Sequence, residues 1–339
     1  MSSRADRGTV QRGTSYDVAR EAGVSQSTVS RVFRPGTSVA PATRDRVMAA
    51  AARVGYRPNA IAASLITRRS HLVAVVISNL TNLHYPEVLA ELTARLSAEG
   101  LRVLLFTLST ESEIDAVLDQ VWRYRVDGAI VAARLSPGQE AAFAREGVPL
   151  VLYNRPGHGA FASSVVCEFA AGERMLVDGL IAAGRRRFGL IAGPADSAVG
   201  EARVAGAIAC LAAAGLEPLG VERGDFSHAS GMAATRRLLA AHRLDALIAA
   251  NDVMALGALD TLRHEAGLAI PGDVAVVGFD GVAPAGWPAY QLTTVRQPVE
   301  AMTEAAVRLL LAQVADPARP AEQLRFAGTL VPGRTAPLT

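Results

Sequence analysis

Hydrophobic residues recur with two different periods along the chain, and the change falls near residue 70. Before it, apolar residues follow helical spacing in short segments, which predicts a small unit of short helices. After it, continuous apolar runs such as LVAVVIS (72–78) and DGAIVAA (127–133) alternate with helical patterns. Such runs are typical of parallel strands that helices cover on both faces. We therefore expect a small helical domain followed by a larger α/β body.

The first helical segment, residues 14–33, has the pattern of two short helices joined by a tight turn. Thr14 and Asp17 have the spacing of a capping box, and Gly23 is placed to end the first helix with a positive φ. Ser25 is placed to cap the second helix. The first helix should bury one apolar face, made by Tyr16, Val18, Ala19 and Ala22.

The second helix should present a polar surface, because Val29, Val32 and Phe33 point inward. Glutamine can bond adenine and arginine can bond guanine through paired hydrogen bonds, so a face of this kind suits a DNA major groove. A local packing unit of two helices is the plainer alternative. A third helix, predicted from Pro41 to a stop at Gly55, favours a three-helix DNA-binding unit. We expect three side chains to face base edges: Gln26, Ser27 and Arg31. Four others should mainly contact phosphates or cap helices: Thr14, Ser25, Thr28 and Ser30.

Charge separates the same two regions. Residues 1–70 hold 12 arginines and 4 acidic residues, a net charge of +8, whereas residues 71–339 hold 22 arginines and 28 acidic residues, a net charge of −6. A basic head on an acidic body is the electrostatic pattern of a nucleic-acid-binding protein.

Several classes of protein are disfavoured by what the sequence lacks. No apolar run approaches the roughly 18 residues of a membrane span, and the polar start MSSRADRGTVQRG has no signal-peptide core. Two cysteines, Cys167 and Cys210, give no disulfide framework or metal cluster. The dinucleotide-binding, P-loop and nucleophile-elbow motifs of α/β enzymes are absent from the sequence. We therefore expect a cytoplasmic protein without catalytic residues, metal or cofactor, rather than an enzyme or a secreted sugar-binding protein.

The body should contain two successive doubly wound parallel sheets. Four strands are expected first, at 72–78, 101–107, 127–133 and 149–154, with helices at about 86–99, up to 125 and 138–146 between them. The series restarts after about residue 170 with strands at 187–194, 245–251 and 274–280, and LTTVRQP (292–298) leads to a last helix and LRFAGTLV (324–331). Ligands bind beyond the carboxyl ends of strands in such sheets, so a cleft between two subdomains is the expected site.

Six motifs in order make the chain resemble the LacI/GalR family of bacterial transcription regulators over nearly its whole length. The motifs are YDVAREAGVSQSTVSRV, TRDRVMAAAARVGYRPNAIAASL, LIAGP, ANDVMALGA, VVGFD and LTTVRQP. The resemblance implies a helix-turn-helix headpiece and a body like the periplasmic sugar-binding proteins, with three crossings between subdomains. It divides the chain into an arm (1–13), a DNA-binding domain (14–57), a hinge (58–70), and a body (71–339) with an N-subdomain at about 71–167 and 298–328 and a C-subdomain at about 168–297 and 329–339.

The hinge includes a helix-compatible stretch, residues 59–66, that is too short to be stable alone. In the family, paired hinge helices enter the minor groove and a leucine wedges apart one base step, which bends the duplex. Leu65 holds the matching position, and Asn59 and Ala62 are further expected contacts. Ordinary linker packing is the alternative for Leu65.

The resemblance also implies a set of ligand-binding residues, most of them at strand ends. The C-subdomain should supply Arg203, Asn251, Asp280 and the stacking ring of Phe226, while Gln297 lies at a crossover. The N-subdomain should supply His84, Tyr85, Asn154 and Arg155. Each has a plainer alternative: Phe226 and Tyr85 as core aromatics, His84 as a surface helix residue, Asp280 as a turn cap. Asp252 is expected to cap the helix that follows it.

The sequence thus predicts a repressor, at least a homodimer, that a sugar or sugar-acid effector releases from a palindromic operator. The dimer should form through the first helices of the two subdomains, without a tetramer, because VPGRTAPLT contains no heptads. A corepressor-dependent regulator and a ligand-independent DNA-binding protein remain alternatives. The sequence leaves the effector open, because His84 stands where the family often has an aromatic residue, and Val199 and Glu201 depart from well-known members.

Overall fold

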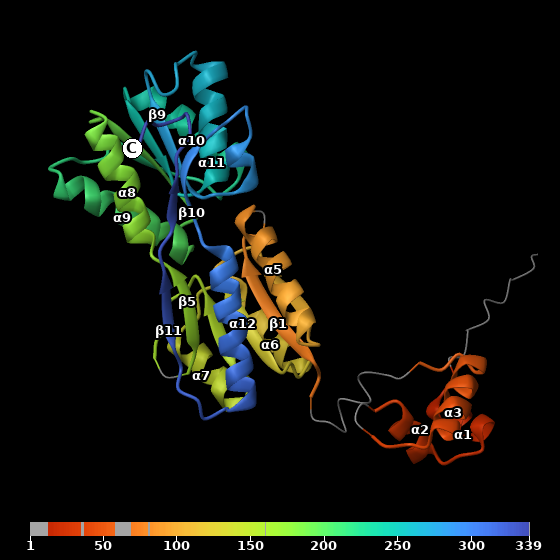
Figure 1. The fold of residues 1–339 in the computed structure, drawn as a ribbon. Coiled ribbons are helices and arrows are strands. Elements are labelled where there is room, and N and C mark those ends of the chain that lie inside the picture. Colours follow the sequence, from red (N-terminus) through yellow and green to blue (C-terminus); the bar gives the residue numbers. More distant parts are fainter. Residues whose placement is uncertain (1–12, 35–36, 58–68, 81, 160, 339) are drawn as a thin grey trace, which may run out of the picture. The chain divides into compact units, whose positions relative to one another are not determined.

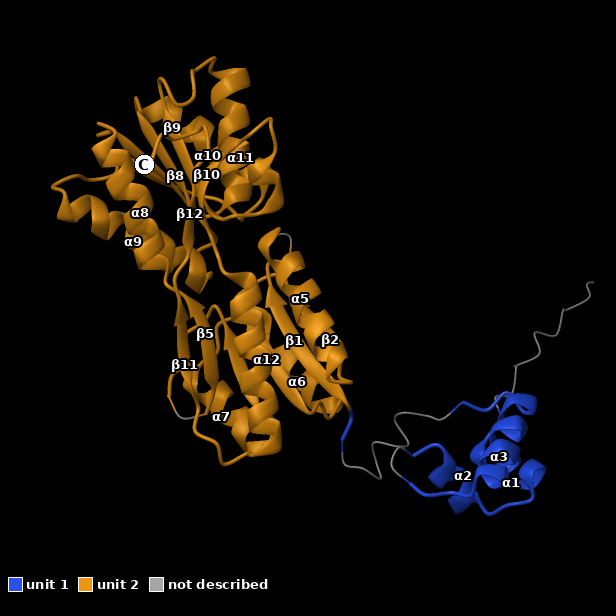
Figure 2. Ribbon diagram, viewed as in Figure 1, with its two compact units in different colours: residues 1–70 blue, residues 71–339 orange. Residues whose placement is uncertain are grey.

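The computed structural model describes residues 13–34, 37–57, 69–80, 82–159 and 161–338. They belong to two compact units, residues 1–70 and residues 71–339 (Figure 2). None of the described helices combines the length and the apolar composition that crossing a membrane requires.

The smaller unit contains three helices, α1 (Ser15–Ala22), α2 (Gln26–Val32) and α3 (Pro41–Arg53). The capping box is confirmed: the Asp17 amide donates to the Thr14 hydroxyl at 3.2 Å, and the Thr14 amide donates to the Asp17 carboxylate at 3.0 Å. Gly23 has a φ of 63°, as expected for a residue that ends a helix in the left-handed region. The expectation for Tyr16 was wrong, because its side chain is 73% exposed and only the other three residues of that face are buried.

The N-subdomain is built on a six-stranded sheet in the order β11-β5-β4-β3-β1-β2, in which every neighbouring pair is parallel. Its strands are β1 (Leu72–Ser78), β2 (Arg102–Leu108), β3 (Gly128–Ala132), β4 (Leu150–Tyr153), β5 (Ser163–Cys167) and β11 (Gln323–Phe326). Its helices are α5 (His84–Ala98), α6 (Ile114–Arg123), α7 (Pro137–Arg145) and α12 (Val299–Ala315).

Strand β1 shows why this sheet needs helices on both faces. Val73, Val75 and Ile77 belong to a core shared with α5 and α12, whereas Ala74 and Val76 belong to a second core with α6 and α7. Successive side chains of a strand point to opposite faces, so a continuous apolar run is buried on both.

The C-subdomain repeats this arrangement on a second sheet, which contains β9 and β10 (Figure 1). This sheet has six strands in the order β12-β10-β9-β8-β6-β7. Its strands are β6 (Phe188–Ala192), β7 (Gly220–Arg223), β8 (Ala246–Ala249), β9 (Ala275–Asp280), β10 (Thr293–Arg296) and β12 (Thr329–Val331). Its helices are α8 (Phe169–Ala182), α9 (Ala198–Ala213), α10 (His228–Ala241) and α11 (Asp252–Asp260). The chain passes between the sheets after β5, after β10 and after β11.

Three features of the sheets differ from the expectation. Strands β5 and β7 were not predicted, because SSVVC and GVER lack the long apolar run that marked the others. The last segment, LRFAGTLV, forms two strands in different sheets rather than one. Strand β12 pairs antiparallel with β10, so the second sheet is parallel except at this edge.

Helices α10 and α11 cross closely through two glycines. A Cβ atom on Gly257 would lie 2.1 Å from the His228 carbonyl oxygen, and one on Gly231 would lie 2.3 Å from the Met254 carbonyl oxygen. Both positions oppose backbone atoms, which cannot move aside as a flexible side chain can.

We expect Gly257→Ala to destabilise the body by roughly 1–3 kcal/mol, although alanine favours a helix, because the methyl group overpacks this crossing. Thermal unfolding of the full chain measures the effect. Gly138→Ala in α7 is the matched control, since its Cβ would meet only the Ser136 hydroxyl at 3.9 Å. A Gly257→Ala protein that melts with or above the wild type would contradict this packing.

Candidate functional site

The exposed face of α2 carries the residues expected to meet DNA. Gln26, Ser27, Ser30 and Arg31 are all exposed on this helix. The Ser25 hydroxyl accepts the Thr28 amide at 3.2 Å and lies 2.9 Å from the Thr28 hydroxyl, so both side chains take part in the helix cap.

The arginines of this unit divide into two groups. Arg20 pairs with Asp17 at 2.5 Å, Arg53 pairs with Glu21 at 2.9 Å, and Arg44 donates to a backbone carbonyl. Within the described part of the unit, no hydrogen bond or ion pair holds the Arg31 side chain. Its guanidinium therefore stays available to a partner outside the chain. Asn59, Ala62 and Leu65 lie outside the described residues, so their expected roles stay predictions.

The centre of the body is a buried ion pair between α9 and the end of β9. Arg203 donates to the Asp280 carboxylate at 2.7 Å, and the two side chains are 2% and 0% exposed. Arg203 also donates to the Ala250 carbonyl at 2.6 Å, and its guanidinium carbon lies 4.9 Å and 4.3 Å from the ring centres of Phe169 and Phe279. Two aromatic faces and two acceptors thus fix the direction of the guanidinium.

Asp280 connects this pair to the other subdomain. Its carboxylate accepts the Gln297 side chain at 2.7 Å and the Asn82 side chain at 3.3 Å. The side-chain amide nitrogen of Asn154 in turn donates to the side-chain oxygen of Gln297 at 2.7 Å. A continuous polar network therefore joins the strand ends of both sheets, and it brings together four expected residues: Arg203, Asp280, Gln297 and Asn154.

A second buried ion pair lies on the N-subdomain side. Arg155 donates to Glu111, and these side chains are 3% and 4% exposed. Glu111 also accepts the Ser78 hydroxyl at 3.2 Å and the Arg134 amide at 3.1 Å, while its own amide donates to the Asp196 carboxylate of the C-subdomain at 2.9 Å.

His84 is the least satisfied side chain of the site. It is 2% exposed, and neither ring nitrogen has a hydrogen-bond partner among the described residues. Burial lowers the pKa of His84 to about 4, with Arg203 adding to the decrease and Asp280 opposing it. Its ring meets the ring of Tyr85 edge-on at 5.4 Å, so it is no surface helix residue.

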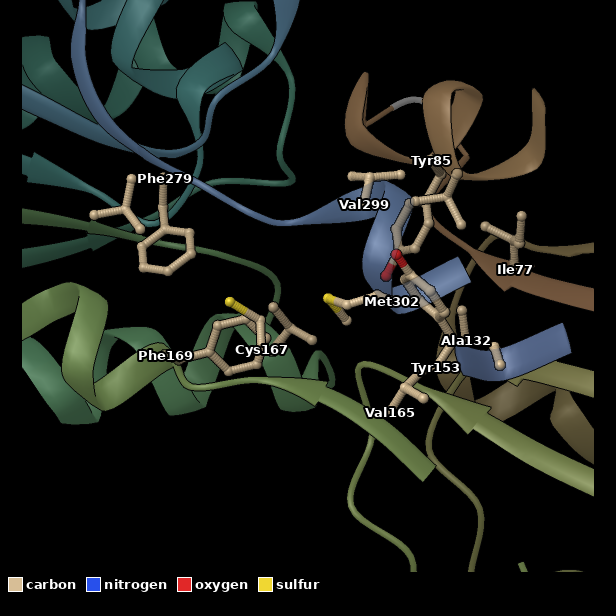
Figure 3. Close-up of a cluster of buried hydrophobic side chains, with 14 of the residues drawn as sticks. Ile77, Tyr85, Ala132, Tyr153, Val165, Cys167, Phe169, Phe279, Val299 and Met302 are labelled. Carbon is tan, nitrogen blue, oxygen red and sulfur yellow. The ribbon is translucent and has the colours of Figure 1, made fainter. Parts of the chain in front are cut away.

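Aromatic and apolar side chains pack beside these polar groups. Figure 3 shows Phe169 and Phe279 on the C-subdomain side, and Tyr85, Tyr153 and Met302 on the other. All belong to one buried cluster that includes residues of both subdomains. Tyr85 is thus part of the core, and its expected contact with a ligand stays a prediction.

Phe226 and Asn251 lie apart from the Asp280 network. Phe226 is 4% exposed, and a Cβ atom on Gly193 would lie 2.4 Å from its ring, so the ring packs into the core. Asn251 caps α11 by accepting the Met254 amide at 3.0 Å, and its side chain donates to the Phe226 carbonyl at 3.2 Å. Their expected contacts with a ligand stay predictions.

The expectation that Asp252 caps α11 was wrong, because Asn251 is the cap. Asp252 is the first residue of the helix, fully buried, and it accepts the Thr294 hydroxyl and the Val282 amide. Burial raises the pKa of Asp252 to about 7, and the nearby Asp280 adds to the increase.

Sequence reasoning missed Ser78, Asn82, Glu111 and Asp196. Ser78 and Asn82 come at the end of β1, where the rule that selected Asn154 also applies. Glu111 begins a short 3-10 helix (Glu111–Glu113) and Asp196 lies in a turn, and only the folded structure brings them within reach of Arg155 and of each other.

A surface groove of about 560 Å³ lies between α5 and the start of α12 and meets the network only at Gln297. Four glutamates line it: Glu87, Glu91, Glu300 and Glu304. Arg95 contacts Glu91, Glu300 and Glu304 at 3.5–3.8 Å, so these carboxylates already share a cation. The buried network, with unsatisfied polar atoms between two subdomains, is the better candidate site.

Glu173 lies behind the site, between α8 and α9, and is 1% exposed. Burial raises the pKa of its carboxyl group to about 8, although Arg203 opposes the increase. The folded protein therefore holds a proton there that the unfolded chain releases above about pH 4.5, and stability is lost as pH rises towards about 8.

We expect Glu173→Gln to remove this loss, because glutamine carries no ionisable proton. Between about pH 5.5 and 7.5, the unfolding free energy of the wild type should fall relative to the variant by about 1.4 kcal/mol per pH unit. Urea unfolding at several pH values measures the difference, with the exposed Glu217→Gln as control. Parallel pH profiles for wild type and Glu173→Gln would show that the carboxyl group is ionised in the folded state.

Comparisons with known proteins agree with this architecture. Residues 14–59 match the family model "Bacterial regulatory proteins, lacI family", and residues 177–336 match "Periplasmic binding protein-like domain". The HTH-type transcriptional regulator CelR of Thermobifida fusca is 36% identical over 315 residues, which cover 90% of this chain and 92% of that protein.

Two solved structures extend the similarity to three dimensions. The lac repressor dimer bound to operator and the anti-inducer ONPF has a TM-score of 0.85 and 30% identity, covering 96% of this chain and 99% of that one. The CelR–cellobiose complex has a TM-score of 0.71 and 34% identity, covering 96% and 100% of the two chains.

Proposed function

Because the chain belongs to the LacI family of bacterial regulatory proteins, we propose that it is a transcriptional repressor controlled by a small effector. It binds a palindromic operator as a homodimer in the cytoplasm, and a sugar or sugar-acid effector releases it. The observation that carries the proposal is the buried network of Arg203, Asp280, Gln297 and Asn154, which joins two subdomains and offers donors and acceptors to one ligand. The lac repressor dimer is bound to operator and CelR is bound to cellobiose in the structures to which this chain is similar, which supports operator binding and effector binding here.

DNA recognition falls to the polar face of α2. Gln26, Ser27 and Arg31 are exposed there and reach base edges, while Thr14 and Ser25 fix the helices through their caps. One headpiece offers few contacts, so paired headpieces supply the affinity for a two-fold operator.

Effector binding acts through the contacts between subdomains. A ligand in the cleft changes the bonds that Asn82 and Gln297 make with Asp280, because the same groups must meet its hydroxyls. The body begins at His71, whose amide donates to the Asp127 carboxylate at 2.9 Å and whose carbonyl accepts the Arg102 amide. Because these bonds fix His71 to the N-subdomain, a movement of the N-subdomain also moves the start of the hinge, and the headpieces separate.

We expect Arg31→Ala to weaken specific operator binding by about 1–3 kcal/mol and to relax the preference at one base pair. Binding titrations with the operator and with single-base variants measure this. Arg53→Ala is the control, because Arg53 lies on α3 and pairs with Glu21. Equal losses on operator and random DNA would mean that Arg31 contacts only phosphate.

We expect a panel of sugars and sugar acids, with cellobiose and ribose among them, to contain a ligand that lowers operator affinity. Asp280→Asn should abolish the response, because it removes the negative charge that pairs with Arg203 and replaces one of the two oxygens that accept from Arg203, Gln297 and Asn82 by a donor. Glu265→Gln, at an exposed pair with Arg236, should respond as wild type does. A full response in Asp280→Asn would place the effector elsewhere, and tighter operator binding on ligand addition would identify a corepressor.

A further inference from the structure

Helix α2 is too short to hold its own position. It has 7 residues, whereas an isolated helix in water needs roughly 12–15. Ser25 caps its N-terminal end, next to Gln26 and Ser27. At the other end, the last carbonyl groups of a helix have no partner within the helix and must find one elsewhere. Arg31 lies in this last turn, so the position of its backbone depends on what those carbonyl groups bond.

Two side chains from beyond α2 bond these carbonyl groups. The Thr37 hydroxyl lies within hydrogen-bonding distance of the Arg31 carbonyl oxygen and 2.8 Å from the Arg34 carbonyl oxygen. The Arg44 guanidinium, on α3, donates to the Val32 carbonyl at 3.2 Å and lies 3.5 Å from the Thr37 carbonyl oxygen. A cation at the C-terminal end of a helix is also favoured by the helix dipole. Thr37 and Arg44 thus connect the end of α2 to α3.

Hydrophobic packing alone fixes this end of the helix poorly. Val29 and Val32 are the buried residues of α2, and Phe33, which follows it, is partly buried. Burial of apolar surface has no preferred direction, whereas a hydrogen bond does. A guanidinium that reads a base must bring its N–H groups to about 2.7–3.2 Å from the base acceptors. A small displacement of the last turn of α2 therefore removes the contact that Arg31 makes.

We infer that Thr37 and Arg44 are positioning residues for DNA reading, because they hold the last turn of α2 and so determine how Arg31 meets its base pair. This inference rests on the proposed function, in which Arg31 faces a base edge. Thr37 is partly buried and its hydroxyl bonds within the protein, so it acts without contacting DNA. Gln26 and Ser27, at the opposite end of α2, keep their positions through the Ser25 cap.

The first test removes the Thr37 hydroxyl from the full-length protein. Thr37→Val keeps the branched shape of the side chain, whereas Thr37→Ser keeps the hydroxyl and serves as control. The wild type first selects its operator from random duplex DNA, and binding is then measured on this operator and on random duplex. We expect Thr37→Val to bind the operator about three- to tenfold more weakly and random DNA unchanged, and Thr37→Ser to match the wild type on both. No loss in Thr37→Val, or an equal loss on both DNAs, overturns the inference.

The second test shows whether Thr37 acts through Arg31. In an Arg31→Ala background, Thr37→Val should weaken operator binding by no more than about twofold further, because the side chain that it positions is gone. A role in folding alone would weaken both backgrounds equally, so a full additional loss overturns the inference and leaves the proposed function intact. Arg31→Ala with wild-type operator affinity would instead contradict base reading by Arg31. A wild type that selects no sequence would contradict the proposed function, and the inference falls with either result.

The third test distinguishes Arg44 from a phosphate contact. Arg44→Met keeps most of the side-chain length and removes the donors, and Arg46→Met removes the same charge from an exposed position on the same helix. A phosphate contact lowers affinity on all DNA and contributes to its salt dependence. We expect Arg44→Met to lose about three- to tenfold more operator affinity than Arg46→Met, with equal affinity of the two variants for random DNA. Equal losses on the operator, or a loss on random DNA confined to Arg44→Met, overturn the positioning role of Arg44.

Discussion

The contacts between the two subdomains depend on the carboxylate of Asp280. It accepts from Arg203, Gln297 and Asn82, which come from α9, a crossover segment and the end of β1. A buried charge is tolerated only when paired and fully hydrogen-bonded, so the three donors and the carboxylate require one another. Removal of one partner of such a buried pair typically costs about 3–5 kcal/mol. The same requirement makes the network sensitive to a ligand, because any new hydroxyl must enter a set of bonds that is nearly complete.

Two residues of this network have a strained backbone. Asn154 and Asp280 have φ values of 54° and 125°, in the region that side chains other than glycine rarely occupy. Such conformations cost on the order of 1–3 kcal/mol each and persist where the surroundings fix them. Asn154 and Asp280 end strands and turn their side chains into the network, so the strain serves to orient the groups that join the two subdomains.

The local features could be predicted from the sequence because they depend on residues that are adjacent in the chain. The Thr14 capping box, the stop at Gly23 and the apolar runs of β1 and β9 each follow from a few adjacent residues. The rule that sites lie at strand ends found Asp280 and Asn154. It did not find Glu111 or Asp196, since neither is the residue at which a predicted strand ends, and tertiary contacts alone bring them to Arg155 and to each other. The choice between Asn251 and Asp252 as a helix cap was also decided by tertiary contacts, because Thr294 and Val282 engage Asp252.

Release from the operator by an effector requires that the effector site and the headpiece are thermodynamically coupled. An effector can shift operator binding only by its difference in affinity for the two states of the protein, and the effect is reciprocal. The most direct test is to measure the dissociation constant of the effector with free protein and with operator-bound protein. We expect the operator to weaken effector binding by the same factor by which the effector weakens operator binding. An effector that binds both forms with equal affinity would contradict it.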